Sequence, residues 1–294
     1  MDEIDFKKIN ISKMRNTEKG TEPVREEIIK FINETSKVYD ENDELLAIFI
    51  KGITSNEMIE IGRGIARHKG WSNSRGAYAG SVKPRIIQSG KYKGRRTIVG
   101  NKVRSSVIGY LMPYLVKDPK PQLSKATKKD REYYNTEVKR LYNYYDEFIK
   151  QLMPEEYKKQ VEYLEPLSDG IKISDTTTNI QVNYDQQAFY HEDKGNKNLY
   201  GSITTYYPTG EEYEGGEFVL GDYLTAFKIQ EGDFLYVNQS AIHGTLPTTK
   251  GVRLSCVGFQ SVRLINYYKR LEKKTIEFID LMIEKHKMNT LKTP

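Results

Sequence analysis

The chain has 294 residues, of which 37% are hydrophobic and 29% charged, and its formal net charge at pH 7 is +6. This length and apolar content suit one large domain with a core of its own, and no apolar run is long enough for a membrane-spanning helix. The single cysteine, Cys256, excludes an internal disulfide and any zinc site built from several cysteines.

Two helices are predicted near the N-terminus. The first begins at Thr21, which can cap it, with Pro23 in the first turn; its apolar face consists of Val24, Ile28, Phe31 and Ile32. The second begins at Thr54, which forms a capping-box pair with Glu57, and it ends near Gly70.

The segment from Ile61 to Lys117 contains 13 Lys and Arg residues and not one Asp or Glu. Soluble surfaces normally intersperse acidic and basic residues, so this segregation predicts a surface for a polyanion such as nucleic acid. The alternative is a solvated basic face in a lysine-rich protein. The segment is also dense in Gly and Ser, which favours strands and loops over helix.

A long helix is predicted over residues 129–152, where large apolar and aromatic residues recur at helical spacing: Tyr134, Val138, Leu141, Tyr145 and Phe148. We interpret this tyrosine stripe as core packing. A last helix is predicted from about Ile265 to His286.

From Ile171 the hydrophobic pattern changes to short segments separated by turn residues. We predict six strands, at Asn179–Asp185, Ser202–Tyr207, Glu217–Leu220, Ala226–Ile229, Phe234–Asn238 and Val252–Val262. Many short strands with turn signals between them indicate an antiparallel sandwich or jelly roll.

His191-Glu192-Asp193 is a candidate metal-binding triplet at the end of a strand. Strand alternation turns residues 191 and 193 to the same side, so one imidazole and one carboxylate can reach the same ion. His243 follows the strand Phe234–Asn238, and a jelly roll can bring it to the same place. Two histidines and one carboxylate leave metal positions open, as non-haem Fe(II) requires to bind a co-substrate and O₂.

Arg253-Leu254-Ser255 follows on the last strand of the β region. An arginine with a neighbouring hydroxyl can make a bidentate, charge-assisted contact with a carboxylate. The distal carboxylate of 2-oxoglutarate needs such a partner while its keto acid end binds iron.

The segment from Asn183 to Phe259 resembles the Fe(II)/2-oxoglutarate-dependent dioxygenase superfamily, through HED, GGEFVL, QEGDFLYVNQSAIHG and RLS in that order. The resemblance implies that His191, Asp193 and His243 are the catalytic iron ligands. It also implies that Arg253 and Ser255 hold 2-oxoglutarate, with O₂ as the second co-substrate.

Within the superfamily the chain is most similar to the TET/JBP group, which oxidises the 5-methyl group of a pyrimidine in nucleic acid. The similarity rests on HEDKGN at 191–196 and on SRGAYAG at 74–80, and it covers roughly residues 70–262. It implies that the target base is flipped out of a duplex or single-stranded. The candidate residues that bind this base are Asn196, Arg75, Tyr78 and Trp71, and Asn196 is the strongest candidate.

The chain departs from the TET/JBP pattern before the metal triplet. Some members have an arginine there that contacts 2-oxoglutarate, whereas this chain has DQQAFY at 185–190. Another group, Asn183 or Gln187, would have to serve.

We therefore expect an α+β fold with a double-stranded β-helix (jelly-roll) core and flanking N-terminal and C-terminal helices. Residues 1–20 should be loosely ordered, and 21–294 should form one dioxygenase domain. Its parts are a helical and basic segment at 21–170, the jelly roll at 171–263 and a C-terminal helix at 264–288.

Three functions remain open from the sequence. The first is a dioxygenase that oxidises 5-methylcytosine or thymine in nucleic acid, which the acid-free basic segment favours. The second is a dioxygenase that hydroxylates a protein side chain or a free small molecule, and the third is a non-enzymatic β-sandwich binding protein. DNA or RNA, the extent of oxidation and the oligomeric state are left open.

The acidic, polar start of the chain lacks the apolar core of a secretory signal. With its lone cysteine, this predicts an intracellular protein, cytoplasmic or nuclear. A composition rich in Lys, Ile, Asn and Tyr is typical of an AT-rich genome, such as that of a virus or a protist.

Overall fold

The computed structural model describes residues 4–67, 84–86, 96–98, 104–113, 118–193 and 199–290. Its larger sheet has nine strands, in the spatial order β1 (Lys7–Asn10), β3 (Ser36–Tyr39), β4 (Leu45–Ile50), β14 (Phe234–Asn238), β10 (Tyr200–Tyr206), β17 (Leu254–Phe259), β9 (Asn179–Tyr184), β7 (Arg104–Leu111) and β8 (Gln122–Leu123). The smaller sheet has four, in the order β15 (His243–Thr245), β12 (Phe218–Leu220), β13 (Thr225–Phe227) and β2 (Lys30–Ile32). Two short ladders pair β11 (Glu214–Gly215) with β16 (Thr248–Lys250) and β5 (Pro84–Ile86) with β6 (Arg96–Ile98).

Most neighbouring strands are antiparallel, and the two parallel pairs, β1 with β3 and β13 with β2, both involve N-terminal strands. The two sheets face each other across a shared core, in which the Phe49 and Phe227 rings meet edge to face with centroids 5.8 Å apart. Strands of both sheets contribute to this core: Ile32, Val38, Ile203, Phe218, Leu220 and Leu235. This two-sheet arrangement agrees with the predicted jelly roll.

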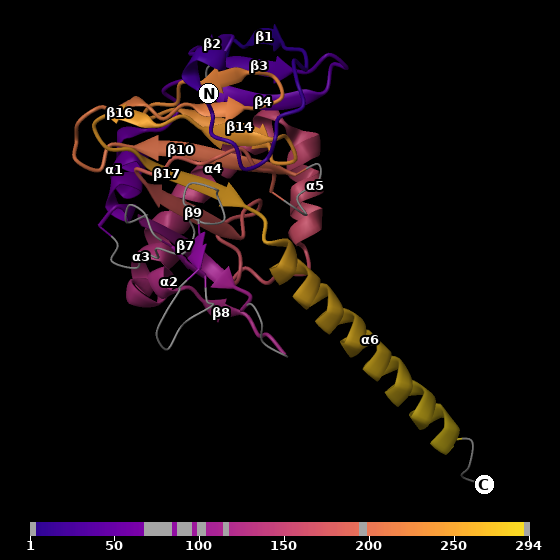
Figure 1. Ribbon diagram of the computed structural model, residues 1–294. Helices are drawn as coiled ribbons and strands as arrows, with labels where there is room; N and C mark the ends of the chain where they lie inside the picture. The colour runs from indigo at the N-terminus through magenta and orange to yellow at the C-terminus, as the bar shows by residue number, and fades with distance from the viewer. Residues whose placement is uncertain are drawn as a thin grey trace.

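Helices cover the other face of the larger sheet (Figure 1). They are α1 (Asn56–Ile65), α2 (Lys125–Lys129), α3 (Arg131–Tyr133), the π-helical turn η3 (Tyr134–Val138), α4 (Lys139–Leu152) and α5 (Pro154–Leu164). The last helix, α6 (Val262–Thr290), extends away from the body. None of the helices in the described ranges is long and apolar enough to cross a membrane.

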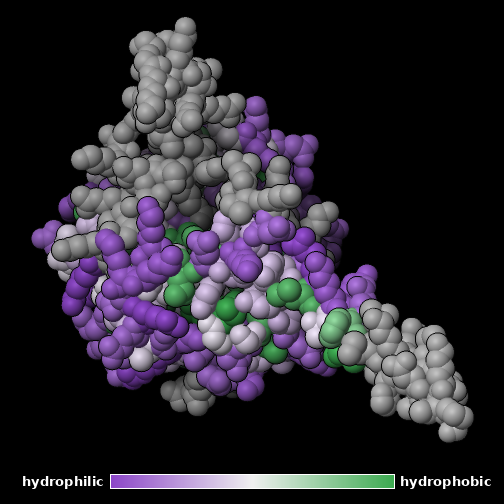
Figure 2. All heavy atoms as spheres, turned by 90° about the horizontal axis from the view of Figure 1, so that it is seen from below, coloured by the Kyte–Doolittle hydropathy of each residue, from purple (hydrophilic) through white to green (hydrophobic). Residues whose placement is uncertain are grey.

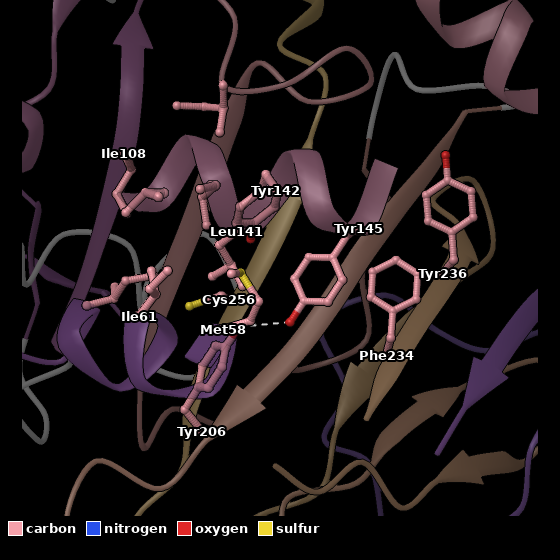
Figure 3. Close-up of a cluster of buried hydrophobic side chains, with 14 of the residues drawn as sticks. Met58, Ile61, Ile108, Leu141, Tyr142, Tyr145, Tyr206, Phe234, Tyr236 and Cys256 are labelled. Carbon is pink, nitrogen blue, oxygen red and sulfur yellow. Dashed lines mark hydrogen bonds between the residues drawn. The ribbon is translucent and has the colours of Figure 1, made fainter. Parts of the chain in front are cut away.

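The core between helices and sheet is rich in tyrosine, as the helical stripe predicted (Figure 3). The Tyr145 ring of α4 stacks on Phe234 of β14 with centroids 4.7 Å apart, and its hydroxyl lies 3.2 Å from that of Tyr206. Cys256 of β17 is buried in the same core. One face of the larger sheet therefore packs against the helices, and the other face is turned toward the smaller sheet.

The surface seen from below is largely hydrophilic, with hydrophobic side chains where α6 leaves the body (Figure 2). Four large apolar side chains of α6 are exposed: Leu271, Ile276, Phe278 and Ile279.

The six strands expected after Ile171 are all present, as β9, β10, β12, β13, β14 and β17, with ends shifted by a few residues. The C-terminal helix is also confirmed. The helix expected at 129–152 is present but interrupted by the π-helical turn η3. The helix expected from Thr54 begins at Asn56, because its N-cap is Ser55, whose side chain accepts a hydrogen bond from the Met58 N–H, while the Thr54 hydroxyl contacts that of Tyr145.

The helix expected from Thr21 was wrong. Only the short 3-10 turn η1 (Arg25–Glu27) forms, and β2 follows it. The four-residue spacing of Ile28 and Ile32 suggested a helix face, but β2 instead pairs in parallel with β13, which buries Ile32 in the sandwich.

The expectation of a loosely ordered segment at residues 1–20 was also wrong for Lys7–Asn10. That segment is the edge strand β1, with Ile9 buried in the core between the sheets. Two regular elements before the basic segment, β3 and β4, and the helix α5 were not anticipated.

Candidate active site

Three predicted metal ligands converge at the end of the smaller sheet. His191 and His243 form an isolated antiparallel bridge, and their ring centroids are 4.4 Å apart. Asp193 Oδ2 lies 4.0 Å from His243 Nε2. One ligand atom from each of the three residues can be chosen so that all lie within 4.8 Å of one another.

Both imidazoles are oriented by nearby backbone. His191 Nδ1 lies 2.7 Å from the carbonyl oxygen of Phe189, and His243 Nδ1 lies 2.8 Å from that of Ala241. A carbonyl only accepts, so each Nδ1 carries the proton and Nε2 is the nitrogen that can bind a metal. The Phe218 ring also stacks on His243, with centroids 5.3 Å apart.

This donor set fits Fe(II). Two neutral imidazoles and one carboxylate on one side of an ion leave its other positions for small ligands, which is the arrangement of non-haem iron oxygenases. Glu192, between the two ligands in sequence, is paired with Lys19 at 2.7 Å instead. Among the described residues, the cluster thus consists of the three that the sequence predicted.

A cavity of about 340 Å³ adjoins the metal cluster and lies along the inner face of the larger sheet. The three residues of the metal cluster and Arg253, just before β17, line it. So do alternate residues of β9, β10 and β17: Gln181, Asn183, Ile203, Thr205, Ser255, Val257 and Phe259. Along the direction of β17 the lining runs from the buried Arg253, just before the strand, to the exposed Arg263, beyond its end. Because Arg253 is buried, we call its side of the cavity the closed end.

Arg253 is 3% exposed and is held by backbone carbonyls. Its Nη1 donates to Gly216 O and its Nη2 to Gln186 O at 2.7 Å, while Nε has no hydrogen-bond partner among the described residues. Burial lowers the pKa of Arg253 from its ordinary value. The nearby Glu217 is paired with Arg25 at 2.6 Å. A buried cation with an unused donor fits an anionic ligand.

Ser255 and Asn183, both predicted to bind the co-substrate, lie next to this end of the cavity. They are directly paired across β17 and β9, and Ser255 is paired with Thr205 across β17 and β10. All three line the cavity. They form a polar row one step from Arg253 along the sheet.

Gln187, the other candidate for the missing arginine, lies elsewhere: its Nε2 donates to Glu22 at 2.9 Å, and it does not line the cavity. The residue that does is Gln186, which is 8% exposed and whose Oε1 has no partner among the described residues. Asp185 has a positive φ of 49° and follows the end of β9, so strand alternation could not be extended to residues 186 and 187.

The expected substrate-binding residues Asn196, Arg75, Tyr78 and Trp71 lie outside the described residues, as does most of the basic segment Ile61–Lys117. Arg63, in the described part of that segment, has a structural role. Its Nε donates to Glu231 at 2.9 Å, which ties α1 to the turn before β14.

A scan against protein-family models finds no match for the chain, and a search of curated proteins finds none either. Solved structures do match. NgTET1 in complex with 5mC DNA has a TM-score of 0.52 and 14% identity over 87% of this chain and 82% of that chain.

Two further solved structures have lower TM-scores. An oxidoreductase of the 2OG-Fe(II) oxygenase family from Burkholderia pseudomallei has a TM-score of 0.38 and 13% identity, over 72% of this chain and 84% of that one. The viral collagen prolyl hydroxylase of Paramecium Bursaria Chlorella virus-1, in its 2OG complex, has a TM-score of 0.34 and 11% identity, over 72% and 94%.

The facing sheets share the fold of NgTET1, and one cavity between them is lined by the His-Asp-His cluster and a buried arginine. Of the structures compared above, the likeness with a TM-score over 0.5 is to NgTET1, whose structure contains 5mC DNA.

Proposed function

We propose that the chain is an Fe(II)/2-oxoglutarate-dependent dioxygenase that oxidises the 5-methyl group of a pyrimidine, 5-methylcytosine or thymine, in nucleic acid. The observation that carries the dioxygenase assignment is one cavity with a His-Asp-His cluster along its wall and a buried arginine at its closed end.

His191, Asp193 and His243 hold Fe(II) in this proposal, each imidazole through Nε2. Arg253 binds the distal carboxylate of 2-oxoglutarate, and its burial strengthens that contact because little water competes for the guanidinium. When bound, the iron, the co-substrate and O₂ supply the oxidising power for C–H hydroxylation, and 2-oxoglutarate leaves as succinate and CO₂.

The polar row beside Arg253 orients the co-substrate. The hydroxyl of Ser255 and the amide of Asn183 are within the cavity lining and can donate to carboxylate oxygens. Gln186 has a side-chain amide at the same closed end. We assign it the co-substrate contact that an arginine makes in some TET-like proteins.

Two features support a nucleic-acid substrate. One fold likeness with a TM-score over 0.5 is to a protein whose structure contains 5mC DNA. The chain also carries the acid-free basic segment from Ile61 to Lys117, which suits phosphate contacts. A base must leave the stack to enter the cavity, so a single-stranded or flipped nucleotide is the substrate form.

The test is to add Fe(II) to the purified protein under anaerobic conditions, and then 2-oxoglutarate, O₂ and DNA that contains 5-methylcytosine or thymine. Succinate and nucleosides are measured by mass spectrometry. We expect oxidised 5-methyl groups with the wild type and none with His191→Ala or Arg253→Ala. Glu192→Ala is the matched control, because this residue lies beside the ligands but pairs with Lys19, and it should remain active.

Succinate without nucleoside oxidation, with DNA and with RNA that carries the same methylated bases, would contradict the nucleic-acid substrate and leave the dioxygenase assignment standing. No succinate under any condition, despite bound Fe(II), would contradict the dioxygenase assignment itself.

A further inference from the structure

One wall of the cavity, which we call its floor, consists of side chains of the larger sheet that are paired in rows across neighbouring strands. Ser255 is paired with Asn183 on one side and Thr205 on the other, and the next row outward pairs Val257 with Gln181 and Ile203. All of these residues line the cavity. Rows on one face of a sheet repeat about every 7 Å, twice the rise per residue of a strand.

Gln181 is therefore one row further than Asn183 from the closed end at Arg253. A five-carbon diacid anchored at Arg253 reaches across the row of Ser255 and Asn183. The row that contains Gln181 lies beyond it, toward the end of the cavity at Arg263. This is the part of the floor that faces the substrate in the function proposed above.

The amide of Gln181 has a defined orientation. Its Nε2 donates to Ser105 Oγ, to Val182 O at 3.1 Å and to Asn183 Oδ1 at 3.1 Å. The backbone carbonyl of Val182 can only accept, so reversing the amide would place two oxygens against each other. The orientation therefore leaves Oε1 on the side away from this network.

Gln181 Oε1 has no hydrogen-bond partner among the described residues, although the side chain is only 4% exposed. A buried acceptor without a donor is uncommon in folded proteins and needs an explanation. Because Gln181 lines the cavity, a ligand N–H that approaches this row would satisfy it.

Asn183 has the complementary polarity. Its Oδ1 accepts from Gln181 Nε2 and from Ser105 Oγ at 3.3 Å, which leaves its Nδ2 to donate. The larger sheet thus presents a hydrogen-bond donor, Asn183 Nδ2, in the row assigned to the carboxylate co-substrate. One row further out it presents an acceptor, Gln181 Oε1. A substrate group that binds in this outer row must therefore be a hydrogen-bond donor.

We infer that Gln181 Oε1 accepts a hydrogen bond from the exocyclic amino group of 5-methylcytosine, so that the site selects this base over thymine. The inference rests on the proposed function. In 5-methylcytosine the amino group is on the ring carbon next to the methylated one, so a base that brings its methyl group to the metal also brings its amino group near. Thymine has a carbonyl oxygen at the same position, and two acceptors would face each other.

The test measures anaerobic binding of single-stranded oligonucleotides to the protein loaded with Mn(II) and 2-oxoglutarate, by fluorescence anisotropy. The oligonucleotides carry 5-methylcytosine, thymine or 5-methyl-2-pyrimidinone, in which hydrogen replaces the amino group. The wild type should prefer 5-methylcytosine over both others by about tenfold or more. Gln181→Leu should bind all three alike.

Gln187→Leu is the matched control, because Gln187 pairs with Glu22 and does not line the cavity. It should keep the wild-type preference. If Gln181→Leu does not fold, binding of the three oligonucleotides to the wild type still tests the inference. The reason is that 5-methyl-2-pyrimidinone lacks the amino group, so the proposed hydrogen bond is removed on the side of the ligand.

Equal binding of the three oligonucleotides by the wild type, or an unchanged preference in folded Gln181→Leu, would overturn the assignment of Gln181. Failure of the proposed function is a separate result: none of the three oligonucleotides binds, and none is oxidised in the assay with Fe(II) and O₂ described under the proposed function. That result would overturn the base assignment as well.

Discussion

The backbone N–H groups of His191 and His243 each donate to the carbonyl oxygen of the other residue, both at 2.9 Å. The separation of the two imidazoles is thus set by backbone hydrogen bonds that replacement of either side chain by alanine does not remove. Metal binding and folding should therefore respond independently to changes at these positions.

We expect His243→Ala to lower the affinity for Fe(II) by more than about 100-fold, a larger effect than loss of an outer contact to a metal ligand. The melting temperature without metal should change little, because the backbone bridge remains. Anaerobic metal titration and thermal unfolding of the apoprotein check the two expectations. Glu192→Ala should bind metal like the wild type, and equal metal binding by His243→Ala would refute the ligand assignment.

Arg253→Met should remove the response to 2-oxoglutarate. In the presence of Mn(II), we expect 2-oxoglutarate to raise the melting temperature of the wild type, because a ligand that binds only the folded state stabilises it. The variant should show no such rise, since loss of a buried charge pair costs about 2–5 kcal/mol of binding. Arg63→Met, which breaks an ion pair with Glu231 away from the cavity, is the control that should keep the rise.

Gly216→Ala should weaken 2-oxoglutarate binding through Arg253. Gly216 has a φ of +68°, and a Cβ added there would lie 2.9 Å from Arg253 Nη1. Gly210 has a φ of +80° with nothing within 4 Å of the added Cβ. Both alanine variants should lose about 1–2 kcal/mol of stability to the left-handed backbone. Calorimetric titration should show weaker 2-oxoglutarate binding in Gly216→Ala alone, and equal binding in the two variants would count against the effect.

Asp146 should make stability depend on pH. This carboxylate of α4 is 4% exposed, and burial raises its pKa from 3.8 to about 6, although Thr176 N and Oγ1 donate to it at 3.1 and 2.6 Å. Between these pKa values the folded state keeps a proton that the unfolded state releases. The stability from this group is present below pH 4 and is lost as the pH rises through 6, by on the order of 3 kcal/mol.

The variant Asp146→Asn has no carboxyl group to titrate at this position, so it does not lose this contribution to stability as the pH rises. The difference in unfolding free energy between variant and wild type should therefore shift in favour of the variant from pH 4 to pH 7. Urea unfolding at several pH values measures it. A difference that stays constant across this range would show that Asp146 titrates normally in the folded protein.

The convergence of His191, Asp193 and His243 could be predicted from sequence because its signals are local, although His191 lies in an isolated bridge to His243 and not at the end of a regular strand. The N-terminal strands could not, because β2 is defined by its pairing with β13, nearly two hundred residues away in the chain. Gln181 was likewise not anticipated. In the sequence it is an ordinary residue of a predicted strand. Only its pairing with Val257 and its hydrogen bonds to Ser105 and Asn183 distinguish it from other strand residues.

Cys256 lies on β17, the strand that begins just after Arg253 and carries Ser255, but it faces the tyrosine core on the opposite side of the sheet. Burial raises the pKa of its thiol well above the ordinary value and so disfavours the reactive thiolate in the folded protein. Since it is the only cysteine in the chain, a thiol-specific reagent will label the protein only when the sheet opens. The native sequence thus contains its own single-site probe of unfolding, and labelling rates would report ligand stabilisation without an introduced tag.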